Sequence, residues 1–212
     1  MKVDVHQMLS EKEVANLDQV AQQAIADAEV LREIVDGVVS KDETFRYNCF
    51  KVLIQVCEAA PGALYPEWDT FVELLGSSNA FHRGLAIQII ARLTRADTEQ
   101  RFDDVFDRFF DMLDDDKVMV SRYLVQSAGQ IVQSKPYLRE RVTARLLTVD
   151  ETRHTESRKD LIKADIVQVL GESFKELEDK ERIVAFVEQQ LESSSPKARK
   201  AAKEFLKAHV ID

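Results

Sequence analysis

The same residue types recur along this chain at intervals of 37, 38, 42 and 36 positions. When the repeats are aligned, equivalent residues form three columns. The first column is basic at four of its five positions, the second lies three residues later, and the third lies four residues after the second, which is the spacing of one helix face. The columns are Arg46, Arg83, Ser121, Lys163 and Arg199; Cys49, Ala86, Leu124, Ile166 and Ala202; and Leu53, Ile90, Ala128, Leu170 and Leu206. Such a period predicts stacked helix hairpins, because one hairpin cannot bury both of its apolar faces. We therefore expect the third column to be buried between helices.

Glycine and proline are scarce, with six and four copies in 212 residues. Sheets and long loops use these residues at their turns, so their scarcity favours helices joined by short links. Phe102, Phe106, Phe109 and Leu113 follow the spacing of one helix face, and no stretch shows sustained period-two alternation. The sequence therefore predicts an all-α protein.

Start and stop signals divide the chain into short helices. Residues 10–13 and 40–43 have the sequence of capping boxes, and Pro66, Pro136 and Pro196 suit the first turn of a helix, where no backbone N–H is needed. The expected helices span residues 10–26, 28–39, 42–59, 65–76, 80–95, 98–113, 117–134, 136–148, 152–175, 179–192 and 196–209.

The recurring unit resembles the HEAT repeat, a helix hairpin of about 37–47 residues. The segment 196–206 (PKARKAAKEFL) is similar to the VR-x-x-A-x-x-x-L pattern of that family, and Asp42 to Arg46 and Asn79 to Arg83 follow its polar turn with a basic residue. The resemblance covers residues 10–212. Two departures are Ser121 in the basic column and the extra residues around 151–159 in the fourth unit, which imply a longer helix or a bulging loop.

This resemblance implies a right-handed α-α superhelix, a solenoid of about five HEAT-like hairpins forming a single domain over residues 1–212. The approximate units are 10–40, 41–79, 80–116, 117–150 and 151–195, followed by a capping helix over 196–212.

Charge and targeting signals restrict the partners. The chain has 38 acidic and 29 basic side chains, a net charge of -9, whereas duplex DNA binding needs a basic face. No signal peptide or long apolar run is visible, so we expect a soluble, cytoplasmic protein without a membrane partner. Cys49 and Cys57 lie eight residues apart in one expected helix, roughly 12 Å between Cα atoms, too far for a disulfide. They are expected to be reduced core residues.

The residues that carry catalysis or bind metals are sparse. His6, His82, His154 and His209 lie in four different units, and no metal, nucleotide or hydrolase motif is present. We expect no cofactor, no metal and no enzymatic activity, although a Cys–His dyad between units stays open. Residues 114–116 are three aspartates that follow an aspartate-rich helix. They are interpreted either as part of a cation site or docking ridge, or as a solvated face and a cap for the next helix.

One alternative function is that of an enzyme. Trp68-Asp69 is similar to the Trp-Asp pair of HEAT-like alkylpurine DNA glycosylases, so the alternative is such a glycosylase or another nucleic-acid-processing enzyme. The following residues, Thr70 to Glu73, hold no aspartate at the place where that family has its catalytic one.

The preferred interpretation is a non-enzymatic scaffold or adaptor that binds a protein partner. The resemblance implies that the second helix of each hairpin lines a concave binding face. The candidate contact residues are then the polar or aromatic positions Glu67, Trp68, Asp104, Asp107, Asp111, Arg141, Arg145 and Glu188. The aspartates and arginines among them either form separate ridges that dock a partner of complementary charge or pair within the molecule.

Overall fold

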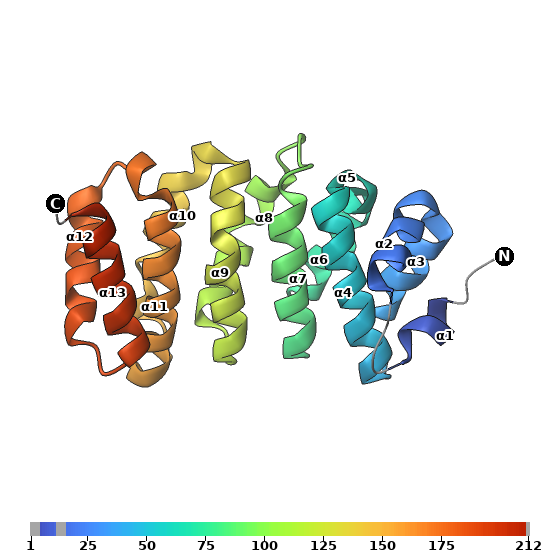
Figure 1. Cartoon of the computed structure of the whole chain (residues 1–212), viewed down its shortest axis with the longest axis horizontal. Helices are drawn as coiled ribbons and strands as arrows, with labels where there is room; N and C mark the ends of the chain where they lie inside the picture. The colour runs from blue at the N-terminus through green and yellow to red at the C-terminus, as the bar shows by residue number, and fades with distance from the viewer. Residues whose placement is uncertain (1–4, 12–15, 211–212) are drawn as a thin grey trace. The chain divides into compact units, whose positions relative to one another are not determined.

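The computed structural model describes residues 5–11 and 16–210, and these residues form helices and connecting turns without any strand (Figure 1). The prediction of an all-α protein is therefore confirmed for this part of the chain. The chain divides into two compact units, Met1–Glu99 and Gln100–Asp212. Each unit is described by itself.

The first unit is organised around one long helix, α4, which packs against α2, α3, α5 and α7, while α6 packs against α7. Its elements are α1 (Val5–Leu9), α2 (Leu17–Ala26), α3 (Ala28–Gly37), α4 (Glu43–Ala59), α5 (Pro61–Leu64), the 3-10 turn η1 (Tyr65–Glu67), α6 (Trp68–Leu74) and α7 (Ala80–Leu93).

The second unit is organised around α11, which packs side by side with α9 and α13 (Figure 1). Its elements are α8 (Arg101–Phe110), η2 (Asp111–Asp114), α9 (Val118–Ser134), η3 (Pro136–Leu138), α10 (Arg139–Leu146), η4 (Val149–Glu151), α11 (Glu156–Ser173), η5 (Phe174–Glu176), α12 (Lys180–Gln189), η6 (Gln190–Glu192) and α13 (Pro196–His209). We call α4, α7, α9, α11 and α13 the first helices and α6, α8, α10 and α12 the second helices.

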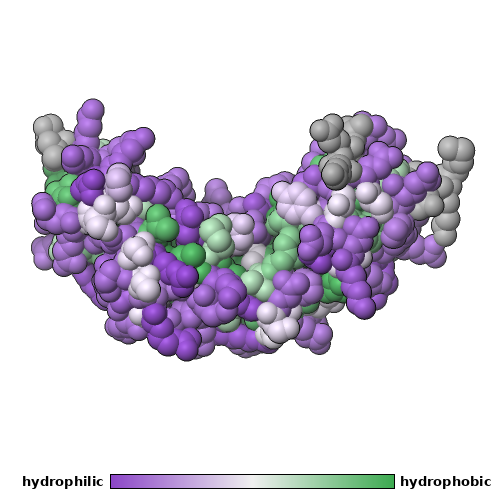
Figure 2. All heavy atoms as spheres, turned by 90° about the horizontal axis from the view of Figure 1, so that it is seen from below, coloured by the Kyte–Doolittle hydropathy of each residue, from purple (hydrophilic) through white to green (hydrophobic). Residues whose placement is uncertain are grey.

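The repeated apolar columns form the core. Leu53, Ile90 and Ala128 are 0% exposed and Leu170 is 1% exposed, which confirms the predicted register. The column that begins at Cys49 is also buried at all five of its positions. Hydrophilic residues cover most of the side shown in Figure 2, with hydrophobic residues in smaller patches between them.

The N-terminal helix boundary differs from the expected one. The helix predicted over 10–26 ends at Ala26 as expected, but its predicted start is wrong, because α1 ends at Leu9 and α2 begins at Leu17. Ser10 follows α1 and its hydroxyl donates to the His6 carbonyl at 2.7 Å, so Ser10 does not cap a following helix. The last residue of the predicted capping box, at position 13, lies outside the described residues.

The second predicted capping box is displaced by two residues. Asp42, rather than Ser40, caps α4, because its carboxylate accepts a hydrogen bond from Phe45 N at 3.0 Å. The Ser40 hydroxyl accepts from Asp42 N at 3.1 Å and thereby shapes the turn before the cap.

The second helices are shorter than predicted, because each has a 3-10 turn at one end. Pro66 and Pro136 lie in the first turn of η1 and η3, and Pro196 begins α13, as predicted. The predicted helix over 98–113 begins only at Arg101, after Gln100, whose left-handed φ of 59° interrupts helix geometry. The helix predicted over 152–175 begins at Glu156, and the extra residues of the fourth unit form η4 and a link.

Arginines of the basic column close the turn before three first helices, α4, α7 and α13. Nη1 of Arg46, Arg83 and Arg199 donates to the carbonyl oxygen six residues earlier, at 3.0, 2.9 and 2.6 Å. Each of those carbonyls belongs to a serine whose hydroxyl accepts from the backbone N–H two residues further on. The motif Ser-x-(Asp/Asn/Ser)-x-x-x-Arg is therefore one structural device used at three turns; we call it the arginine clamp.

The third unit has Ser121 in place of the clamp arginine, and the long link of the fourth unit supplies basic groups there instead. His154 Nε2 lies 3.0 Å from Ser121 Oγ and 3.2 Å from the Leu113 carbonyl oxygen. Arg153 donates from its backbone N to Asp114 Oδ1 at 2.7 Å and from Nε to Oδ2 at 2.8 Å. The extra residues of the fourth unit thus supply hydrogen bonds at the turn where Ser121 replaces the clamp arginine.

Candidate functional site

The aspartates and arginines predicted as contact residues pair with each other. Arg141 Nη2 lies 3.0 Å from Asp107 Oδ1, and Arg145 Nη2 lies 2.6 Å from Asp111 Oδ1. Together with the hydrogen bond from Tyr137 Oη to Asp103 Oδ1 at 2.8 Å, these pairs form a ladder between residues 34 positions apart. The alternative of pairing within the molecule is the one that the structure shows.

The ladder is exposed to solvent, so its stability contribution is small. Asp107 and Asp111 are 76% and 67% exposed, and pairs of this kind contribute about 0.2–1 kcal/mol each. The Arg141 guanidinium also lies 3.7 Å from the centre of the Phe106 ring. Asp104 is exposed beside the ladder.

The remaining predicted contact residues are scattered. Trp68 is 1% exposed and packs against Tyr65 with ring centroids 5.8 Å apart, so its assignment as a surface contact is wrong. Its large ring contributes more to the core than to any surface. Glu67 accepts from Arg32 Nη2 at 2.8 Å and joins the start of α6 to α3. Glu188 is exposed on α12.

The aspartates of the turn after α8 have structural partners. Asp115 Oδ1 accepts from Lys117 N at 2.8 Å and shapes the turn before α9. The N-cap of α9 is Lys117, which makes no side-chain cap hydrogen bond, so the expectation that an aspartate of 114–116 caps the next helix is wrong. Burial of the Asp114 carboxylate acts to raise its pKa, but the hydrogen bonds and charge of Arg153, with the charge of His154, outweigh it and leave the pKa below its usual range. Within residues 5–11 and 16–210, no three His, Cys, Asp or Glu side chains are grouped so that they could hold a metal ion.

The cysteines and His82 belong to the packed first unit. Cys49 and Cys57 are buried free thiols, as expected. Burial raises the pKa of each thiol to about 12. Burial and the charge of Arg46 lower the pKa of His82. His82 lies in the first turn of α7, and its Nδ1 is 3.1 Å from the hydroxyl of Ser77 in the preceding turn.

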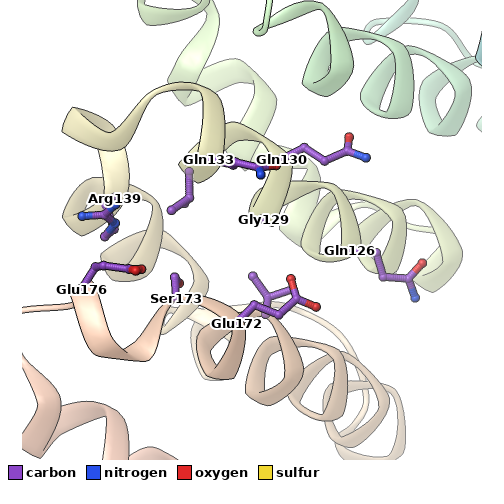
Figure 3. Close-up of a pocket in the computed structure, with 10 residues that line it drawn as sticks. Gln126, Gly129, Gln130, Gln133, Arg139, Glu172, Ser173 and Glu176 are labelled. Carbon is purple, nitrogen blue, oxygen red and sulfur yellow. The ribbon is translucent and has the colours of Figure 1, made fainter. Parts of the chain in front are cut away.

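Two cavities lie between first helices of the second unit, away from the predicted contact residues. A cavity of about 560 Å³ opens between α9 and α11, and a shallower one of about 400 Å³ lies between α11 and α13. Glu172 lines both, so the two adjoin; we call them together the first-helix groove. The polar lining of the larger cavity comes from α9, the start of α10, α11 and η5, and Figure 3 draws it: Gln126, Gln130, Gln133, Arg139, Glu172, Ser173 and Glu176.

Close packing of α9 on α11 positions these side chains. A Cβ added to Gly129 would lie 3.1 Å from Glu172 Oε2, so the absence of a side chain at Gly129 leaves room for this carboxylate. The glutamines follow each other on α9 at the spacing of one helix face. Figure 3 shows Arg139 and Glu176 at one end of the cavity and Gln126 at the other.

The charged groups of the groove lack partners. Among the described residues, none forms an ion pair or hydrogen bond with Glu172, Glu176 or Arg139, and Arg139 Nε is buried without an acceptor. Gln130 Oε1 is likewise buried without a donor. Buried polar atoms usually have partners, so Arg139 Nε and Gln130 Oε1 mark a place where a ligand or water completes the bonding, whereas Glu172 and Glu176 are exposed to solvent.

A buried carboxylate anchors one end of the groove. Asp165 on α11 is 2% exposed and accepts from Arg122 Nε at 2.7 Å, from Gln126 Nε2 at 3.2 Å and from Lys197 Nζ. These partners tie α9 and α13 to α11. The hydrogen bond from Arg122 to Asp165 raises the pKa of this arginine despite its partial burial.

The sequence interpretation missed the Asp165 cluster and the groove. The sequence contained one sign of the Asp165 cluster. Asp165 interrupts the apolar run Ala164-Asp165-Ile166-Val167 on a helix, and a charged residue buried in such a run needs a partner. Its partners lie 43 and 32 residues away, and no local pattern predicts them.

Comparisons with known proteins leave the family open. No family model matches the chain, and no curated protein matches it. A solved crystal structure from the Northeast Structural Genomics Consortium, described as an engineered protein, is similar at 12% identity with a TM-score of 0.47, covering 98% of each chain. Similarity at this level supports no conclusion about function. None of the helices in the described part of the chain is long and apolar enough to cross a membrane.

Proposed function

We propose that this protein is a non-enzymatic scaffold of HEAT-like hairpins, stacked as a right-handed solenoid, that binds a segment of a protein partner in the first-helix groove. The recurring columns and the arginine clamp support the repeat. The unpaired Glu172, Glu176 and Arg139 around a 560 Å³ cavity are the observation that carries the binding function.

The first helices are a better binding face than the second helices. A partner on the aspartate ladder would have to displace Arg141 and Arg145 from bonds that they already form. In the groove, by contrast, the charged groups have no such competitor among the described residues. New charge-assisted hydrogen bonds to a ligand therefore cost less there.

The chemistry of the lining suits a polypeptide. A glutamine amide both donates and accepts hydrogen bonds, so Gln130 and Gln133 complement the N–H and C=O groups of an extended backbone. The adjoining cavity adds apolar surface from Phe205 between α11 and α13, where an apolar side chain of the segment can pack.

The experiment is a selection of random displayed peptides on the whole chain, followed by fluorescence anisotropy with the selected peptides. The variant Gly129→Leu fills the cavity from α9 and favours helix formation, so the fold is retained. We expect this variant to weaken binding at least tenfold.

The matched control is Gly62→Leu, because a Cβ at Gly62 meets nothing within 4 Å and Gly62 lies in the first unit. Its affinity should equal that of the unchanged protein. Failure to select any peptide, or equal affinity for Gly129→Leu, would show that the groove is not a peptide-binding site.

A further inference from the structure

The last helix, α13, carries a basic stripe on its outer face. It packs against α11 and α12, and its buried side chains are Ala198, Ala202, Phe205 and Leu206. The opposite face of the helix presents Lys200, Lys203 and Lys207, which are all exposed and span roughly 10 Å along the axis. Lys200 makes a loose pair with Glu204 at 3.7 Å, whereas Lys203 and Lys207 form no ion pair within residues 5–11 and 16–210. We call these three residues the lysine stripe.

The helix α3 carries an acidic stripe of the same length. It packs against α2 and α4, and its buried side chains include Leu31, Ile34 and Val35. The opposite face presents Glu29, Glu33 and Asp36, which are all exposed and also span roughly 10 Å. Arg32 lies beside them, but its guanidinium donates to Glu67 on η1 at 2.8 Å. We call these three carboxylates the acidic stripe.

An exposed valine follows each stripe at the same spacing. Val39 comes three residues after Asp36 and is 51% exposed, and Val210 comes three residues after Lys207 and is 47% exposed. Laid side by side in the same direction, the two helices would oppose charges of different sign over two turns and bring the two valines together. The two faces therefore match in charge, in length and in the position of an apolar side chain.

We infer that copies of this chain associate head to tail, with the lysine stripe of one copy against the acidic stripe of the next. The occupant of each stripe is a second copy, because this chain itself carries the face of matching length and opposite charge. The inference goes beyond the proposed function, since no residue of either stripe lines the first-helix groove.

Solubility alone does not explain the two stripes. The outer faces of a repeat array must be polar so that its ends stay in solution. Interspersed charges of both signs meet that need. Here the signs are segregated, one on α3 and the other on α13. Segregated complementary charge guides two surfaces together and fixes how they align, so it indicates a contact between the two faces.

The contact is weak and open-ended. One exposed ion pair changes an affinity by less than about fivefold, and two turns of helix offer less than the roughly 800 Å² per partner of a stable complex. The two stripes are different surfaces, so a pair of copies still exposes one stripe of each kind and adds further copies. The average mass should therefore rise continuously with protein concentration.

The test is sedimentation velocity of the whole chain over a wide range of concentration and at several salt concentrations. We expect association at low salt that weakens about tenfold or more at high salt, because the charges are exposed and screened. A protein that stays monomeric at every concentration would overturn the inference.

Charge reversal locates the contact. The α13 variant is Lys200→Glu, Lys203→Glu and Lys207→Glu, and the α3 variant is Glu33→Lys and Asp36→Lys. Each alone should associate about tenfold more weakly, because like charges then face each other. An equimolar mixture should regain the association, since the reversed stripe of one variant complements the reversed stripe of the other.

The matched control is Glu181→Lys with Glu188→Lys on α12, two exposed glutamates whose reversal changes the net charge as much as the α3 variant does. The control should not weaken association. Thermal melts verify folding, and if the α13 variant does not fold, Lys203→Gln with Lys207→Gln takes its place and should weaken association in the same direction.

Cross-linking tests the direction of the contact. When Val39→Cys and Val210→Cys chains are mixed and oxidised, they should form a disulfide-linked pair, whereas neither variant should do so alone. Cys49 and Cys57 are buried free thiols and do not compete. Equal cross-linking of a single variant with itself would show that like faces meet, which contradicts a head-to-tail contact.

Three further results would overturn the inference. The first is equal association of the α3 variant and its control. The second is a mixture of the α3 and α13 variants that does not regain association. The third is binding of the chain to phosphatidylserine vesicles at physiological salt that is lost in the α13 variant, without any self-association, because the lysine stripe would then bind anionic lipid and not a second copy.

Discussion

Single side chains in this protein change their role with burial. Asp165 and Asp107 are both aspartates on amphipathic helices, yet Asp165 is 2% exposed and Asp107 is 76% exposed. A buried carboxylate is tolerated only when charged and polar groups bond to it, so Asp165 has three partners. Asp107 remains hydrated, so its charge would be tolerated without any bonding partner in the protein. Residue type alone therefore predicts neither role.

The buried third column gives a direct test of the core at this scale. Leu53→Ala and Ile90→Ala should each lower the free energy of unfolding by about 2–5 kcal/mol, because both side chains are fully buried and truncation leaves a cavity. Urea melts measure the change, with Glu188→Ala as an exposed control. Ala128→Leu should also destabilise, by about 1–3 kcal/mol, because the site has no room for a larger side chain. A loss below about 0.5 kcal/mol at Leu53 would contradict tight packing.

The two thiols provide a second test. Burial raises the pKa of Cys49 and Cys57 to about 12, so the folded protein holds almost no thiolate at pH 8. An aromatic disulfide reagent should react with neither cysteine until urea unfolds the chain. Because the folded pKa exceeds the value of about 9 in the unfolded chain, the free energy of unfolding should fall as the pH rises from about 9 to 12. Rapid labelling of the folded protein at pH 8 would contradict both statements.

At the scale of helices and turns, the repeat is held by its turns as well as by its core. Three turns carry an arginine clamp, and the fourth replaces it with Arg153 and His154 from a neighbouring link. The end of α3 packs closely on α4, because a Cβ at Gly37 would lie 2.4 Å from Cys49 Sγ.

Removing one clamp tests its contribution. Arg83 Nη1 donates to the carbonyls of Ser77 and Ser78, at 2.9 and 3.2 Å, and hydrogen bonds of charged groups contribute about 1.5–3 kcal/mol when buried. Because this arginine is half-buried, Arg83→Ala should lower the free energy of unfolding by about 1–2 kcal/mol in urea melts. Arg108→Ala, which removes an exposed arginine on α8, should have almost no effect. Equal effects of the two changes would show that the clamp has no special role.

At the scale of the whole molecule, the chain consists of two compact units with the same repeated elements. The arginine clamp occurs at two turns of the first unit and at one turn of the second. The charge distribution differs along the chain, because the last helix, α13, is rich in lysine within a protein of net charge -9.

The proposed solenoid has a measurable size. A compact globule of 212 residues has a radius of gyration of about 17 Å. Stacked hairpins separated by about 8–10 Å should give roughly 20 Å or more by small-angle X-ray scattering. A value near 17 Å would contradict the solenoid while leaving the groove of the second unit unaffected.

The alternative of a DNA glycosylase predicts the opposite behaviour toward nucleic acid. The acidic net charge and the buried Trp68 both oppose it, so we expect no specific binding to duplex DNA at physiological salt. Fluorescence anisotropy with a labelled duplex, repeated at several salt concentrations, measures this. Submicromolar binding with a steep salt slope, or release of an alkylated base, would favour the enzyme.

Local periodicity in the sequence was sufficient to predict the helices and many of the buried core residues. The spacing of Cys49, Leu53 and their counterparts predicted which positions are buried, because a helix places residues three and four apart on one face whatever its neighbours are. The helix over 196–209 was predicted to the residue, since Pro196 and Ser195 define its start locally. Boundaries were less accurate where 3-10 turns or the left-handed Gln100 shorten a helix.

The candidate site could not be predicted in the same way. Asp107 and Arg141 are 34 residues apart, and Asp165 and Arg122 are 43 apart, so whether they meet depends on how neighbouring hairpins stack. Trp68 was taken for a contact residue because its burial depends on the packing around it rather than on its own segment. The groove likewise lies between α9 and α11, and the missing side chain of Gly129 leaves room in it for Glu172. The sequence by itself determined helices and their inward faces, which depend on local geometry, whereas charge pairing and the groove arise from contacts between distant segments and were specified only by the tertiary structure.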